Sequence, residues 1–392
     1  MNRLFVGAMA LALGTIPAAA QSLDDLNIQI HGYATQGFLY TTQNNIFTTN
    51  SSNGSPAWTE AVINVGAQPT PKLRIGVQAR YFLLGNFGNA ITLDWAAADY
   101  KASDKFGVRF GKVKTPSGLF NEIQDIDPGY IWSLLPQGIY PITSRNSILS
   151  HYGGVIYGTL DLQTAGKLEY RGWAGERVLA RDDGYFLASE ETGTDFPSGY
   201  KQIVDGAALH WRTPLHGLML GASLQHDNQS DNPLTLTIPE LGVMSATSRG
   251  NASDSPQWFG KFETSKFMLA GEYSRQPLYI VTAIPDVITE IGREDNRSWY
   301  GMASYKLTDK LTAGVYHTQF IDKAVNDTLT SGTNRYSKDW VLSGRYDFNE
   351  FLYAKAEQHF IDGTGLGYDI DLNPNGLQPD TKLTIFKIGV SF

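Results

Sequence analysis

Basic side chains occur in two short runs of the sequence. Arg74 and Arg80 lie six residues apart in the first run, and Arg109, Lys112 and Lys114 occupy the second. Residues an even number of positions apart in a β-strand share one face, so Arg74 and Arg80 would point the same way. Basic side chains gathered around a narrow passage attract small anions. Attraction of anions therefore requires secondary-structure elements that place both basic runs around the same passage.

A long segment, 115–151, follows the second run and carries further charged residues. Its acidic residues are Glu122, Asp125 and Asp127, and Arg145 is its one basic residue. The segment also contains apolar stretches that are too hydrophobic for a solvent-exposed loop. It is therefore expected to fold against another part of the protein and to bring its charges with it.

The residues around these runs alternate between apolar and polar with the period of two that is typical of β-strands. After residue 20, no apolar stretch has the length of about 20 residues that a membrane-spanning helix needs. The 40 Gly, 20 Tyr, 19 Phe and 8 Trp suit many strands with aromatic girdles. Sixteen strands are predicted, at 26–40, 57–68, 72–83, 90–100, 106–114, 152–162, 166–175, 204–213, 218–228, 257–265, 266–276, 298–307, 310–321, 338–348, 351–361 and 381–392.

The predicted connections alternate between tight turns and longer segments. Short turns at one rim and long loops at the other are typical of a barrel that crosses an outer membrane. We therefore predict an all-β fold, a transmembrane antiparallel β-barrel of about 16 strands with an inward-folded constriction loop. The long connections are 41–56, 84–89, 115–151, 176–203, 229–256, 281–297, 322–337 and 362–380.

The alternation also predicts which side chains face the membrane. In the strand 72–83, Ile75 and Val77 would face lipid, whereas Gln78 and Arg80 would face a polar lumen. More basic than acidic residues occupy the predicted inner face across all strands. A lumen whose charges pair across strands, with weak selectivity, is an equal alternative.

The alternation breaks in one region. Asp99 lies on the lipid-facing register, and beyond Gly111 either Lys112 or Lys114 must leave that register. We predict a β-bulge near Gly111, because one extra residue in a strand shifts the faces of those that follow.

Both ends of the chain carry signals. Residues 1–20 combine Arg3, an apolar run and three alanines, which is typical of a cleavable secretory signal peptide. The predicted mature protein, 21–392, is a single barrel domain of the bacterial outer membrane. The last strand ends on Phe392, and this tail resembles the one that the outer-membrane barrel assembly machinery recognises.

The flanks of the long segment contain a motif of glycines, basic residues and prolines. Its residues are Arg109, Gly111, Lys112, Lys114, Pro116, Gly118, Asn121, Glu122, Leu135, Pro136, Gln137, Arg145, Gly153 and Gly154. With the barrel pattern of the whole mature chain, the motif resembles the phosphate-selective porins O and P and their relatives, including dicarboxylate-type porins. The resemblance implies a homotrimer of sixteen-stranded channels for small anionic or polar solutes, with 115–151 bent into the lumen.

We predict a passive diffusion channel for small hydrophilic solutes that favours anions, surrounded by outer-membrane lipid and lipopolysaccharide and using no cofactor or metal. The segment 115–151 lacks the arginine-rich ladder of the family, so the resemblance does not extend to phosphate selectivity. The predicted pore-lining and constriction residues are Arg74, Arg80, Arg109, Lys112, Lys114, Glu122, Asp125, Asp127 and Arg145.

Other functional classes remain as alternatives. The formal net charge of −8 argues against nucleic acid as a partner. An outer-membrane enzyme, a lipid or peptide hydrolase, could use a pair such as Ser274 and His317, and a surface receptor could use the long loops. A soluble secreted β-protein is a third alternative. The loop 362–380 spaces its oxygens like a calcium site, but Pro374 stands where the tight turn needs Gly.

Overall fold

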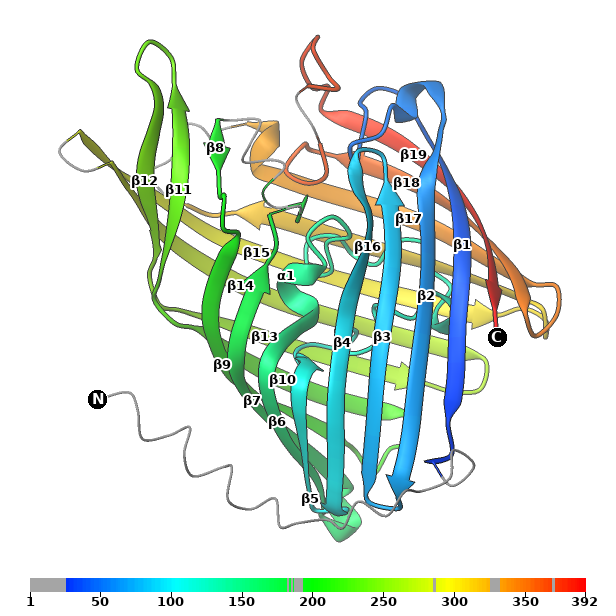
Figure 1. The fold of residues 1–392 in the computed structure, drawn as a ribbon. Helices are drawn as coiled ribbons and strands as arrows, with labels where there is room; N and C mark the ends of the chain where they lie inside the picture. The colour runs from blue at the N-terminus through cyan, green and yellow to red at the C-terminus, as the bar shows by residue number, and fades with distance from the viewer. Residues whose placement is uncertain are drawn as a thin grey trace, which may run out of the picture.

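A closed ring of antiparallel strands encloses one internal space in the computed structural model of the protein (Figure 1). The structure describes residues 26–181, 183–184, 186, 193–284, 287–324, 332–368 and 371–392. The predicted signal peptide 1–20 lies outside these residues. The ring closes where the first and last strands pair, from Tyr33 with Ser391 to Thr41 with Leu383.

Sixteen strands form the wall, which confirms the predicted fold class. They are β1 (Gln29–Thr41), β2 (Ser55–Thr70), β3 (Leu73–Leu84), β4 (Phe87–Ser103), β5 (Phe106–Lys114), β6 (Ser150–Asp161), β7 (Lys167–Leu179), β9 (Tyr200–Arg212), β10 (Leu218–Asp227), β13 (Ser253–Glu263), β14 (Phe267–Ile284), β15 (Ile288–Lys306), β16 (Leu311–Asp322), β17 (Tyr336–Asp347), β18 (Leu352–Asp362) and β19 (Asp380–Ser391).

Three further strands lie outside the wall. The hairpin of β11 (Ser230–Ile238) and β12 (Gly242–Gly250) rises beyond one rim, where β12 pairs with β14 and β11 with the short β8 (Thr194–Asp195) (Figure 1). The predicted loop 229–256 thus contains regular structure. The helices that can be bounded within the described residues are α1 (Asn146–Leu149), η2 (Ser51–Asn53), η3 (Asp127–Gly129), η4 (Gln163–Ala165) and η5 (Thr333–Arg335). Within the described part of the chain, no helix has the length and hydropathy to cross a membrane.

The connections sort to two rims, which we call the short-turn end and the long-loop end. The prediction of a long loop is wrong for two segments at the long-loop end. The segment 84–89 is a tight turn between β3 and β4, and most of 281–297 belongs to the paired strands β14 and β15. The sequence of 281–297 is polar like that of a loop, but β14 and β15 remain paired through most of it. Gly85 forms the first turn at φ +60°, and a Cβ there would lie 2.1 Å from the Thr48 carbonyl oxygen.

The predicted inside and outside faces are confirmed for β3. Ile75 and Val77 are 48% and 39% exposed on the outer face, whereas Gln78 and Arg80 are buried inside. The apolar outer surface and the polar inner surface are those of a barrel with lipid outside and water inside.

The predicted bulge near Gly111 is wrong, because the bulge lies in β4 instead. Gln78 pairs with Trp95 and the next residue of β3 pairs with Leu93, so that Asp94 is the extra residue. Beyond this bulge the faces of β4 are shifted by one. Asp99 consequently faces the lumen, where it pairs with Arg109, and not the lipid.

Candidate functional site inside the barrel

The segment between β5 and β6, residues 115–149, lies within the ring of strands (Figure 1). Many of its polar groups bond to the wall, and the partner strands are distributed around the ring. These strands are β1, β3, β4, β5, β7, β10, β14, β16, β17, β18 and β19. The segment therefore divides the internal space instead of lining one side of it.

Asp127 provides the most heavily paired contact of this segment. Its carboxylate accepts hydrogen bonds from the Lys387 ammonium at 2.6 Å and the Tyr353 hydroxyl at 2.7 Å, and it lies 3.1 Å from the Lys355 ammonium. Asp127 and both lysines are buried. A buried carboxylate with two ammonium partners holds the segment firmly to β18 and β19.

Two wall carboxylates hold the backbone of the segment. Glu357 on β18 accepts from the backbone N–H groups of Ser133 and Leu134 at 2.9 and 3.0 Å. Glu272 on β14 accepts from the Tyr140 hydroxyl at 2.7 Å and from the N–H of Leu119 at 3.1 Å. These bonds satisfy donors that burial would otherwise leave unpaired.

The remaining acidic residues of the segment face the second basic run. Asp125 accepts from the Lys114 ammonium and from the Gln78 amide, each at 2.7 Å. Glu122 lies 2.7 Å from an Arg109 guanidinium nitrogen and 3.4 Å from one of Arg171. Lys114 and Arg109 thus neutralise the segment as well as facing the lumen.

Arg145 and Arg80 are buried in ion pairs. One terminal nitrogen of Arg145 donates to both carboxylate oxygens of Asp94 at 2.9 Å. Arg80 pairs with Glu60, and its guanidinium lies over the Phe82 ring. A buried charge that is paired contributes less to the field of a passage than an exposed one.

Lys112 is the one predicted site residue that the structure places outside the lumen. It shares the outer face of β5 with Phe110, donates to the Leu93 carbonyl oxygen and lies over the Tyr152 ring. Phe110 and Tyr152 are 62% and 49% exposed on that face. The sequence motif therefore contains residues from both sides of the barrel wall: Lys112 lies outside, whereas Arg109 and Lys114 face the lumen.

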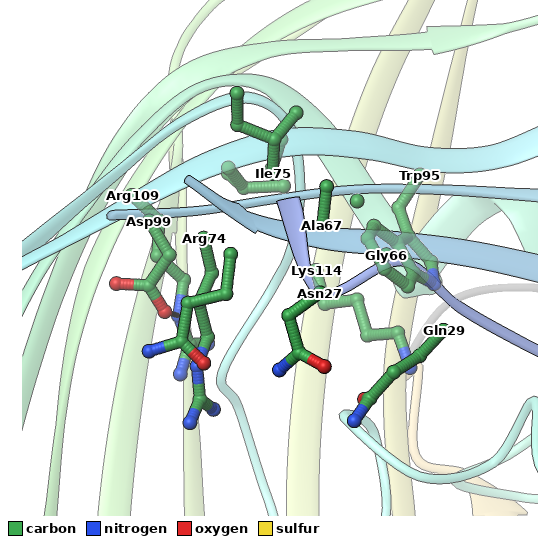
Figure 2. A pocket seen from close by; sticks show the side chains of 14 residues that line it. Asn27, Gln29, Gly66, Ala67, Arg74, Ile75, Trp95, Asp99, Arg109 and Lys114 are labelled. Atoms are coloured by element: carbon green, nitrogen blue, oxygen red, sulfur yellow. Dashed lines mark hydrogen bonds and ion pairs between the residues drawn. The ribbon is translucent and has the colours of Figure 1, made fainter. Parts of the chain in front are cut away.

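A cavity of about 370 Å³ opens below the segment at the short-turn end (Figure 2). Its charged lining residues are Arg74, Arg109, Lys114 and Asp99, so the lining carries more positive than negative charge. Among the described residues, Arg74 has no ion-pair partner, and it lines the cavity together with Arg109 and Asp99, which pair with each other (Figure 2). Arg74 is thus the cation of this set that is available to a solute.

A larger cavity of about 520 Å³ opens above the segment at the long-loop end. Its charged lining residues are Arg177, Asp227 and Glu294. Arg177 lies 3.6 Å from the Asp227 carboxylate, and Glu294 accepts from the Asn296 amide at 2.8 Å. Amides, hydroxyls and aromatic rings make up much of the rest.

The site predicted from the sequence did not include the side chains of the barrel wall that bond to the segment. Lys355, Glu357 and Lys387 lie on the inner faces of β18 and β19, and period-two alternation identifies those faces. Their role depends on the path of 115–149, which no periodic pattern specifies.

The structure does not bring together the Ser274–His317 pair that the sequence offered for an enzyme. Ser274 is buried on the inner side of β14, whereas His317 stacks with Trp340 at 4.5 Å between ring centroids. Trp340 is 56% exposed on the outer face, so the wall separates the nominated pair. The described residues contain no group of three or more His, Cys, Asp or Glu side chains that could hold a metal ion. Asp369 of the calcium-like loop lies outside them.

The fold is that of the outer-membrane porins. Three solved structures illustrate the likeness, each at low sequence identity. OmpF of Salmonella typhi has a TM-score of 0.58 and 14% identity, covering 95% of this chain and 99% of its own. OmpT, an outer membrane protein of Vibrio cholerae, has a TM-score of 0.56 and 12% identity, with the same coverage. An anion-selective porin from Comamonas acidovorans has a TM-score of 0.54 and 10% identity, covering 93% and 99%.

No protein-family model and no curated protein sequence matches the chain. The likeness therefore concerns the fold, and the specific resemblance to phosphate-selective porins stays a prediction.

Proposed function

We propose that the protein is a passive diffusion channel of the bacterial outer membrane for small hydrophilic solutes, with a preference for anions. The observation that carries this proposal is the basic cavity at the short-turn end, inside a closed barrel with an apolar outer face. Basic groups that line a passage raise the local concentration of anions and lower that of cations. Arg74 supplies the exposed charge, and Arg109 and Lys114 add to it.

In this proposal, residues 115–151 are the constriction. The contacts of 115–149 around the ring support that role, because a segment held on opposite sides of the lumen narrows the passage and keeps its position. The short-turn end then faces the periplasm and the long-loop end the exterior. Removal of residues 1–20, recognition of the tail at Phe392 by the assembly machinery and association into a homotrimer complete the proposal.

The test is a reversal-potential measurement on the purified mature protein in planar bilayers under a salt gradient. The wild-type protein should favour anions at low ionic strength, and the preference should decrease toward 1 M salt, where the screening length is about 3 Å. Arg74→Gln removes a cation that has no ion-pair partner among the described residues. It should shift the reversal potential toward cations without disturbing the fold.

Lys112→Gln is the matched control, because Lys112 lies on the outer face of the wall. It should leave the reversal potential unchanged. Equal shifts in the two variants, or none in Arg74→Gln, would contradict the assignment of the basic cavity. Failure of the protein to conduct, together with hydrolysis of lipid or peptide substrates, would favour the alternative of an outer-membrane enzyme.

A further inference from the structure

One small cavity lies between the wall and the long segment, and several of the residues that line it carry buried polar atoms without partners. The cavity has a volume of about 40 Å³, and Trp58 of β2 lines it together with Ser133 and Arg145 of the segment. Trp58 is 0% exposed, and Ser133 and Arg145 are each 5% exposed. All three side chains are thus shielded from the water of the two larger cavities.

Each of these side chains carries a polar atom with no hydrogen-bond partner in the described part of the chain. The atoms are Nε1 of Trp58, Oγ of Ser133, and Nε and Nη1 of Arg145. The pairing of Arg145 with Asp94 uses only Nη2. A buried donor that lacks an acceptor costs about 1–3 kcal/mol. Three residues that line one cavity carry four such atoms, and this coincidence favours an acceptor at that place.

The chemistry of the lining favours an anion. Indole and guanidinium nitrogens only donate hydrogen bonds, and a serine hydroxyl has one proton to donate. The carboxylates in the lining are already engaged, Glu60 by Arg80 and Asp127 by Lys387 and Lys355. Arg80, Arg145 and Lys387 outnumber Glu60 and Asp127, so the lining has a formal charge of +1.

The size of the cavity selects among anions. A volume of about 40 Å³ has room for about one to three water molecules. A monatomic halide fits this space and accepts hydrogen bonds from several directions, whereas a phosphate or sulfate with its four oxygens is larger. We infer that this cavity is a halide-binding site, occupied by chloride in the native protein, which bridges β2 to both Ser133 and Arg145.

The inferred ion has a structural role that is separate from permeation. It joins Trp58 in the wall to two points of the segment, twelve residues apart in the sequence. It would therefore stabilise the docked segment whether or not the channel favours anions. Its test consequently uses structural and thermal measurements on the full protein and does not depend on the proposed function.

The first experiment is crystallography of the detergent-solubilised protein grown in sodium bromide. An anomalous bromide peak in hydrogen-bond contact with Trp58 Nε1, Ser133 Oγ and Arg145 would support the inference. Density there without an anomalous signal would identify water and overturn it.

The second experiment measures thermal unfolding against chloride concentration, with gluconate holding the ionic strength constant. Chloride should raise the unfolding temperature of the wild-type protein, because a ligand that binds only the folded state stabilises it. Ser133→Ala removes one donor and little volume. It should raise the chloride concentration for half-maximal stabilisation about tenfold, the effect of losing one hydrogen bond to a charged group.

Trp58→Phe should abolish the chloride response, and Trp173→Phe is its matched control. Trp173 is also buried, at 4% exposure, and its Nε1 also has no partner among the described residues, but it does not line this cavity. Trp173→Phe should therefore keep the full chloride response. If Trp58→Phe fails to assemble, Ser133→Ala still decides the question. An unchanged chloride response in Ser133→Ala, or equal loss in both tryptophan variants, would overturn the inference.

Discussion

The two large cavities of the barrel differ in the state of their charges. At the long-loop end, Arg177 pairs with Asp227, and Glu294 accepts from a neighbouring amide. At the short-turn end, Arg74 has no ion-pair partner in the described residues, and Arg109 and Lys114 lie nearby. The segment 115–149 separates the two spaces. Solutes would therefore meet a slightly acidic cavity, with a formal lining charge of −1, on one side of the segment and a basic cavity on the other.

The difference shows that the charge of a barrel is not the charge of its pore. The chain has a formal net charge of −8, yet its short-turn cavity is basic. Selectivity depends on charges that are exposed in the passage, whereas paired charges hold the structure together. The following substitutions test this distinction, and they are ordered from the largest expected effect to the smallest.

Asp127→Asn should remove the partition between the two cavities. It leaves the buried Lys355 and Lys387 without their counter-charge, and breaking a buried pair in this way costs about 3–5 kcal/mol. The segment should leave β18 and β19, so that single-channel conductance rises and the two spaces merge. Asp347→Asn removes a more exposed partner, that of Arg345, and should leave conductance at the wild-type value. Equal conductance in both variants would contradict the role of Asp127.

Val77→Arg tests whether the outer face of β3, the strand that carries Arg74, is in contact with lipid. Val77 is 39% exposed on the outer face, and a cation near the middle of a bilayer costs about 2–4 kcal/mol in a barrel. The variant should assemble poorly, as measured by the folded fraction after dilution from urea into vesicles. Arg74→Gln, on the inner face of the same strand, should assemble normally. The reverse order would mean that the faces of β3 are exchanged.

Gln29→Glu and Gln276→Glu place the same new charge at opposite ends of the lumen. Gln29 lines the short-turn cavity (Figure 2), and Gln276 lines the cavity at the long-loop end. Each should lower the anion-to-cation permeability ratio by about twofold, which corresponds to roughly 0.5 kcal/mol for a partly screened charge. The asymmetry of the current–voltage curve should change in one direction in Gln29→Glu and in the opposite direction in Gln276→Glu. Changes of the same sign would show that the segment does not separate the two spaces.

Arg249→Gln should have the smallest effect. Arg249 pairs with Asp231 across the β11–β12 hairpin, and both side chains are about half exposed. Exposed pairs contribute about 0–1 kcal/mol, so thermal stability should change little, and conductance should not change. A clear loss of conductance would place the hairpin in the passage and extend the vestibule to its tip.

The wall of the barrel could be predicted from the sequence because its pattern is local. Each strand repeats every second residue, so Ile75 and Gln78 reveal their faces without knowledge of any other element. The bulge at Asp94 could not be placed in this way. The extra residue pairs with the buried Arg145, which lies 51 positions away in the sequence.

The role of each inner charge could not be predicted for the same reason. Gln78 faces inward as expected, but it donates to Asp94 and Asp125 and is not free in the lumen. Lys112 and Lys114 stand two residues apart in one motif, yet only Lys114 reaches the segment. Which inner charge remains exposed to solutes depends on the path of 115–149, and that path is set by contacts distributed around the whole ring.

These contacts also constrain the order in which the protein folds. The Tyr33 hydroxyl of β1 donates to the backbone carbonyl of Asp125, 92 residues away, and Lys387 of β19 donates to Asp127 across 260 residues. A segment from the first half of the chain thus bonds to both of the strands that close the ring. It can complete these bonds only after the last strand has met the first, since long-range contacts form late when loop closure is costly. During assembly the segment would therefore remain undocked until closure, and its docking would mark the moment at which the barrel becomes a finished channel.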